Sequence, residues 1–152
     1  MLYNIIQKIS KFLLAISLLT MLTQCSTERQ ETVSCFPQSL INVQININLP
    51  AYRNLWYANG WIYLDQQGAG TRGLIIVRID DTHFKAYDRN APHLCPDTDT
   101  TLEVKDGIKI ICPKDGAEWI LRTGEPSKVA KVPPKTYYTI YEASSGTLII
   151  KN

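Results

Sequence analysis

Apolar and polar residues alternate along residues 43–49 of this 152-residue chain. Val43, Ile45 and Ile47 are separated by single polar residues, and Pro50 follows the run. A period of two is typical of a β-strand that has one face on the core and one face in water. Proline ends such a strand because it has no amide hydrogen to donate.

Further segments are short, rich in β-branched and aromatic residues, and separated by residues that favour turns. The expected strands are residues 61–64, 73–79, 84–87, 101–104, 108–112, 119–122, 137–141 and 147–150. Asp106-Gly107 lies between two of them and predicts a tight hairpin. No long segment has a period of 3.6, although residues 51–57 have room for a helical turn. Eight or nine short strands predict an all-β fold, either a sandwich or a partly closed barrel.

The first 24 residues have the parts of a secretory signal. Lys8 and Lys11 supply its positive charge, and residues 12–22 form an apolar run. This run is too short to span a hydrocarbon core about 30 Å thick, which needs roughly 20 apolar residues. We therefore expect residues 1–24 to be a signal peptide.

Leu22-Thr23-Gln24-Cys25 resembles the bacterial lipobox, in which the cysteine carries lipid. It predicts a lipid at Cys25, a tether over residues 25–40 and a single domain over residues 41–152. The protein would then be anchored to a membrane of the bacterial cell envelope and face the periplasm or the cell surface. A cleaved signal with an incidental Cys25 and an uncleaved anchor are the alternatives.

Removal of the expected signal peptide also changes the charge balance. The whole chain has 16 basic and 14 acidic residues, and removing Lys8 and Lys11 leaves 14 of each (16 − 2 = 14). A neutral domain has no extended positive field with which to bind phosphates, and its basic residues are scattered singly. We therefore expect no nucleic-acid partner.

Residues 85–125 contain two short loops separated by a hairpin. The first loop follows Asp88 and contains Ala91 and His93. The second reads Cys112-Pro113-Lys114-Asp115-Gly116-Ala117-Glu118-Trp119. Over residues 70–151 the chain resembles the Rieske [2Fe–2S] domain superfamily, and most of all exported Rieske-like lipoproteins of Bacteroidetes type. In that family one loop has the motif Cys-x-His, and the other has Cys-x-x-His-Gly-Ser/Ala followed by an aromatic residue.

The resemblance implies a degenerate cluster site. His93 and Cys112 match two of the four ligand positions, whereas Ala91 and Asp115 occupy the other two. Each iron would keep one protein ligand of two, so we expect no cofactor, with a [2Fe–2S] cluster as the alternative. Asp115 also lies in an Asp-Gly turn, where aspartate is common for local reasons.

Three cysteines remain if Cys25 carries lipid: Cys35, Cys95 and Cys112. In the Rieske arrangement Cys95 and Cys112 lie on facing loops, so the resemblance implies a disulfide between them in an oxidising compartment. The alternatives are a metal site with His93 and Asp115, free thiols, or a pairing that involves Cys35.

Other chemistry has little support in the sequence. His83 follows an Asp-Asp-Thr turn and is expected to be a solvated loop residue. No spaced catalytic triad is present, so we do not expect an enzyme. Trp56, Tyr57, Trp61 and Tyr63 are aromatic residues that favour the core over a ligand groove. The expected function is a membrane-anchored Rieske-like lipoprotein without its cluster, in a structural or interaction role with an envelope protein. The alternative is electron transfer through a modified [2Fe–2S] or other metal centre.

Overall fold

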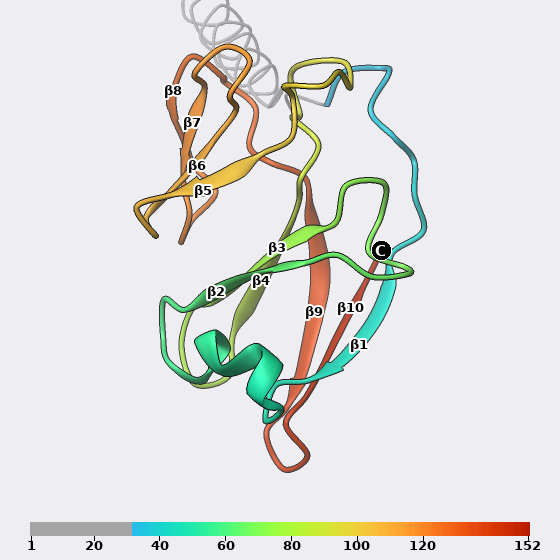
Figure 1. Ribbon diagram of the computed structural model, residues 1–152, viewed down its shortest axis with the longest axis vertical. Helices are drawn as coiled ribbons and strands as arrows, with labels where there is room; N and C mark the ends of the chain where they lie inside the picture. Colours follow the sequence, from blue (N-terminus) through green and yellow to red (C-terminus); the bar gives the residue numbers. More distant parts are fainter. Residues whose placement is uncertain (1–31) are drawn as a thin grey trace, which may run out of the picture.

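The computed structural model describes residues 32–152, which form two antiparallel β-sheets (Figure 1). The predicted signal peptide and Cys25 lie outside the described residues. Among residues 32–152, no helix is long and apolar enough to cross a membrane.

The larger sheet has six strands, and the smaller sheet has four. In spatial order the larger sheet contains β1 (Asn42–Asn46), β10 (Thr147–Lys151), β9 (Thr136–Glu142), β4 (Phe84–Asp88), β3 (Leu74–Arg78) and β2 (Trp61–Leu64). The smaller sheet contains β5 (Glu103–Lys105), β6 (Lys109–Ile111), β7 (Glu118–Ile120) and β8 (Pro126–Lys128). A 3₁₀ helix, η2 (Pro50–Trp56), connects β1 to β2. The predicted all-β class is confirmed.

The hairpin predicted at Asp106-Gly107 is present between β5 and β6. Asp106 and Gly107 have φ angles of 55° and 69°. Two consecutive residues with positive φ give a turn whose twist matches that of the flanking strands. Strand β8 was not expected, because its three residues are all exposed and show no alternation.

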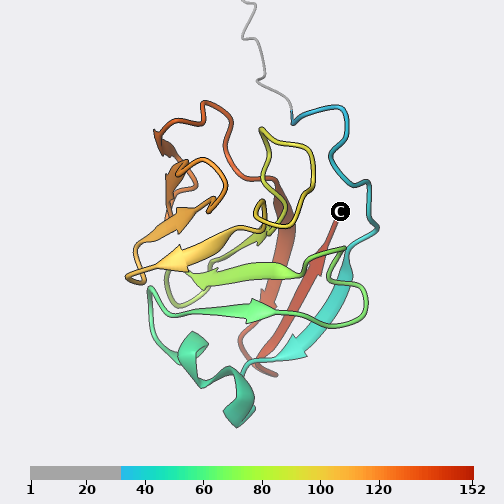
Figure 2. The ribbon, with the colours of Figure 1, turned by 45° about the horizontal axis from the view of Figure 1, so that its top comes forward.

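Strand β3 is buried on both faces because it separates two hydrophobic cores. Leu74 and Ile76 face the first core, which the two halves of the six-stranded sheet enclose. Ile75 and Val77 face the second core, which the four-stranded sheet covers. A strand buried on both sides has a continuous apolar sequence, and β3 reads Leu-Ile-Ile-Val-Arg. Figure 2 shows the four-stranded sheet lying to one side of β3 and β4.

The two halves of the six-stranded sheet meet where β4 pairs with β9. The pairing is short and joins Ala86 to Tyr137 and Tyr87 to Thr136. The buried Tyr137 hydroxyl donates a 2.6 Å hydrogen bond to Asp88 Oδ2 at the end of β4. Burial, together with this contact, raises the pKa of Tyr137. A buried polar contact of this kind reinforces a junction that has few backbone hydrogen bonds.

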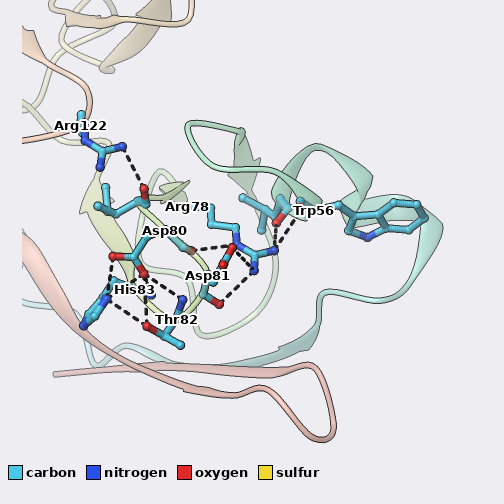
Figure 3. Close-up of polar contacts among 9 residues, drawn as sticks. Trp56, Arg78, Asp80, Asp81, Thr82, His83 and Arg122 are labelled. Carbon is cyan, nitrogen blue, oxygen red and sulfur yellow. Dashed lines mark hydrogen bonds and ion pairs between the residues drawn. The ribbon is translucent and has the colours of Figure 1, made fainter.

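Arg78 holds η2 against the turn between β3 and β4 (Figure 3). Its guanidinium donates to the carbonyl oxygens of Leu55 and Trp56 at 3.0 Å, and to those of Asp80 and Asp81 at 2.9 and 3.0 Å. The bonds to Leu55 and Trp56 satisfy carbonyl groups at the end of the helix, which have no partner within it. The planar fork of arginine allows one side chain to serve both segments.

We predict that Tyr137→Phe destabilises the domain without changing its fold. The substitution leaves Asp88 Oδ2 buried without its donor, which costs about 1–3 kcal/mol and lowers the melting temperature by several degrees. Thermal unfolding followed by circular dichroism measures the change. Tyr138→Phe is the matched control, since the Tyr138 side chain is exposed at 66%. Equal melting temperatures for Tyr137→Phe and the wild type would show that the contact is dispensable.

Candidate functional site

The first loop (residues 89–102) begins at a buried polar network. Asp88 Oδ1 accepts hydrogen bonds from the backbone and side-chain nitrogens of Asn90, at 2.7 and 2.8 Å. The same Asn90 side chain donates to the Thr71 hydroxyl at 2.9 Å. Asn90 also forms an isolated bridge with Thr101, so the two ends of the loop lie together. This network fixes the direction in which the chain continues to Ala91 and His93.

The side chain of His93 points towards the second loop (residues 112–117). Its Nε2 lies 2.7 Å from Asp115 Oδ2, and the ring stands edge-on to Trp119 with the centroids 5.5 Å apart. Trp119 is fully buried and donates its indole hydrogen to the Val132 carbonyl at 2.8 Å. Trp119, the aromatic residue that follows the second loop in the sequence, therefore packs against the imidazole from the second core.

The second loop is a tight turn that brings Cys112 and Asp115 to the same side. The Cys112 amide donates to the Ala117 carbonyl at 2.9 Å, and the Gly116 amide donates to the Cys112 carbonyl at 2.9 Å. The Ala117 amide donates to Asp115 Oδ1 at 3.0 Å. Gly116 has a φ of 71°, a conformation that glycine adopts without strain. Three possible metal ligands lie within 4.8 Å of one another: the Cys112 sulfur, a carboxylate oxygen of Asp115 and a ring nitrogen of His93.

The local environment shifts the pKa of Cys112 and that of Asp115 in opposite directions. Burial raises the pKa of the Cys112 thiol, and the neighbouring Asp115 carboxylate adds to the effect. Burial acts to raise the pKa of Asp115 as well, but hydrogen bonds from His93, Ala117 and Cys112 outweigh it and lower this pKa. The Asp115 carboxylate contacts both the imidazole and the thiol. A protonated, buried thiol is a poor nucleophile.

A second ion pair joins the two loops. Lys114 Nζ lies 2.8 Å from Asp97 Oδ2. Arg72 fixes the Asp97 end by donating to the Asp97 carbonyl at 2.6 Å and to the Thr101 hydroxyl at 2.7 Å. Polar contacts therefore hold the loops together at two places, His93–Asp115 and Asp97–Lys114.

The disulfide implied between Cys95 and Cys112 is wrong. Cys95 pairs with Cys35, with their Cα atoms 5.4 Å apart, and Cys112 is a buried free cysteine. The segment before β1 lies against the first loop, because the Val33 amide donates to the Pro92 carbonyl at 2.9 Å and Phe36 is buried. Cys95 is exposed on the side of the loop that faces this segment, whereas Cys112 points into the second core. Figure 2 shows the segment beside the first loop at the top of the domain.

The residues present do not fit a [2Fe–2S] cluster. A Rieske cluster needs two thiolates and two imidazoles, and this site provides one of each. Ala91 is 1% exposed and packs in the second core with Cys112, so a methyl group occupies the position where the resemblance implies the first cysteine. Cys95 is held in a disulfide and cannot supply the missing thiolate.

Two other sequence interpretations have definite outcomes. His83 is confirmed as a solvated turn residue, paired with Asp80 at 2.8 Å in the turn shown in Figure 3. The expectation that the aromatic residues favour the core is wrong for Trp56, Tyr57 and Tyr63, which are exposed. Trp56, Tyr57 and Trp61 instead line a surface hollow of about 570 Å³. The hollow is lined by no residue of either loop, so it is separate from His93 and Cys112.

No protein-family model matches the chain, and no curated protein matches it. Two solved structures are similar to it. One is a chain in the complex of reduced oxygenase and oxidized ferredoxin in carbazole 1,9a-dioxygenase, with 19% identity over 76% of this chain and 94% of that chain, and a TM-score of 0.42. The other is the ferredoxin of carbazole 1,9a-dioxygenase from Nocardioides aromaticivorans IC177, with 17% identity over 75% of this chain and 98% of that chain, and a TM-score of 0.43.

We predict that peptide mapping under non-reducing conditions recovers Cys35 linked to Cys95, with Cys112 as a free thiol. Replacing both Cys35 and Cys95 by serine should lower the free energy of unfolding by roughly 4 kcal/mol, because the bridge closes a loop of 60 residues. Denaturant unfolding with and without a reductant measures this. The double variant is its own control, since a reductant should destabilise only the wild type. Recovery of a Cys95–Cys112 peptide would contradict the assignment.

Proposed function

We propose that this chain is an exported, membrane-anchored Rieske-like domain that lacks a [2Fe–2S] cluster and has a structural or interaction role at the bacterial cell envelope. The observation that carries the proposal is the buried methyl group of Ala91 at a cluster-ligand position. The cysteine-bound iron would keep a single protein thiolate, that of Cys112, because Ala91 has no donor atom and Cys95 is bonded to Cys35.

The disulfide supports export. Both Cys35 and Cys95 are exposed to solvent, where cytosolic reductants would reach the bridge. Disulfides of this kind persist outside the cytoplasm and are rare inside it. The bridge also agrees with a signal peptide at residues 1–24, which implies an oxidising destination.

The exposed apolar surface supports an interaction role. The hollow beside Trp56 and Tyr57 adjoins a second hollow lined by Ile108 and Ile120, and both hollows include Gly107. The side chains of these four residues, Trp56, Tyr57, Ile108 and Ile120, are all exposed. Exposed apolar residues that gather on one face, rather than singly, mark surfaces that contact other molecules. A protein of the envelope that covers this face is the partner that the proposal requires.

We predict that the purified full-length protein contains neither iron nor acid-labile sulfide and has no visible absorption. The physical reason is that one thiolate and one imidazole cannot hold both irons of the cluster. Metal analysis, sulfide assay and an absorption spectrum of protein produced in cells that assemble clusters provide the measurement.

The variant Ala91→Cys with Asp115→His is the matched control, because it restores both missing donors on the same scaffold. It should gain iron, sulfide and visible absorption relative to the wild type. Iron and sulfide in the wild type would favour the alternative function, electron transfer through a modified centre that uses His93, Cys112 and Asp115.

We also predict that Cys25 carries the membrane anchor. Cys25→Ala should release the protein from membranes or leave the uncleaved precursor, because no other cysteine follows the apolar run of the leader closely. Membrane fractionation and intact mass measure the outcome, with Cys112→Ala as the control that keeps the anchor. Normal processing and membrane retention of Cys25→Ala would show that another feature anchors the chain.

A further inference from the structure

We propose that His93, Cys112 and Asp115 bind a single zinc ion through His93 Nε2, Cys112 Sγ and Asp115 Oδ2, leaving a fourth coordination position for water or an external ligand. The proposal rests on the proposed absence of a cluster, because a cluster would use His93 and Cys112.

The three donor types together match zinc. Thiolate sulfur, imidazole nitrogen and carboxylate oxygen are its common protein ligands, whereas magnesium and calcium prefer oxygen alone. The donors of His93, Cys112 and Asp115 lie within 4.8 Å of one another. Zinc bonds of 2.0–2.3 Å in a tetrahedral arrangement need ligand atoms roughly 3.3–3.7 Å apart. The contact of 2.7 Å between His93 and Asp115 would open by about 0.6 Å, a displacement that small side-chain rotations supply.

The hydrogen bonds of the site leave the required atoms available. Asp115 Oδ1 is held by the Ala117 amide at 3.0 Å, and Oδ2 lies 2.7 Å from His93 Nε2. His93 Nδ1 is buried and has no hydrogen-bond partner among the described residues. Zinc bound to the three side chains would replace the hydrogen bonds that Asp115 accepts from His93 and Cys112, while the backbone of the second loop keeps its own.

The three side chains of the site differ in their exposure to solvent. Cys112 is fully buried beneath the loops, whereas the side chains of His93 and Asp115 are 15% and 25% exposed. An ion can therefore enter from the side of His93 and Asp115 and meet the sulfur last. The methyl group of Ala91 offers no fourth donor, and zinc sites with three protein ligands keep their remaining position open.

A second imidazole–carboxylate pair in the same domain shows what is particular to this site. His83 and Asp80 also lie 2.8 Å apart, but their side chains are 74% and 52% exposed. His93, Cys112 and Asp115 are the sole metal-ligating group of three within residues 32–152, so the His83 pair has no third donor there. The two pairs can therefore be compared directly in one molecule.

The test uses the full-length chain, purified in detergent, stripped of metal with EDTA and carrying Cys25→Ala so that Cys112 is the single free thiol. Titration with Co²⁺ should produce a thiolate-to-cobalt charge-transfer band and the intense visible bands of a tetrahedral site. Zinc should displace one cobalt per chain and abolish both.

Cys112→Ser should remove the charge-transfer band, and His93→Gln or Asp115→Asn should weaken zinc binding at least about tenfold. His83→Gln is the matched control and should bind zinc as the parent does. Because Cys112 is buried, circular dichroism must show that Cys112→Ser folds. His93→Gln and Asp115→Asn test the same zinc site at side chains that are partly exposed, where a substitution disturbs the core less.

The outcomes separate this proposal from the proposed function. Iron and sulfide in the purified protein would overturn the proposed absence of a cluster, and with it the zinc site. Protein without iron that binds no zinc, or in which Cys112→Ser binds zinc as tightly as the parent, would overturn the zinc site alone. His93 and Asp115 would then act only as a contact between the loops. Stoichiometric zinc that depends on all three residues would support both proposals.

Discussion

The hydrogen bonds to the buried carboxyl group of Asp88 connect the scaffold of this domain to its candidate site. One oxygen accepts from Tyr137 on β9 and thereby joins the halves of the larger sheet. The other accepts from Asn90, the residue that starts the turn towards Ala91 and His93. An unsatisfied buried carboxyl group is costly, so Asp88 stabilises the junction of the sheet and the start of the first loop through the same side chain. The position of His93 is thus coupled to the closure of the sheet.

The first and second loops are held in place by contacts between protein side chains, which need no cluster. His93–Asp115 and Asp97–Lys114 join the two loops, and the Cys35–Cys95 bridge joins the first loop to the segment before β1. Trp119 supports the imidazole from the second core. Three independent attachments explain how loops with few apolar residues stay ordered around one free cysteine. The contact between His93 and Asp115 also places these two polar side chains next to the sulfur of Cys112.

The sequence predicted those features that are set locally and missed those set by tertiary contacts. Aromatic and β-branched residues identified β2 with its observed bounds. Asp106-Gly107 identified the hairpin between β5 and β6, because the turn conformation is set by these two residues. Strand β8 has no apolar alternation, since all its side chains are exposed. The partner of Cys95 is 60 residues away, and nothing near Cys95 indicates it. Phe36, next to Cys35, was the available signal: a large apolar residue within an expected tether indicates packing on the domain.

The Cys35–Cys95 bridge also determines how the domain responds to a pulling force from its N-terminal side. Tension along the chain reaches Cys35 before β1 and passes through the bridge into the first loop, so the edge strand β1 is shielded from it. Without the bridge, the segment from Cys35 to Asn42 would straighten, extending the chain by up to roughly 20 Å, and the load would fall on the pairing of β1 with β10. The redox state of one exposed bond thus sets both the reach of the N-terminal segment and the strand that unravels first.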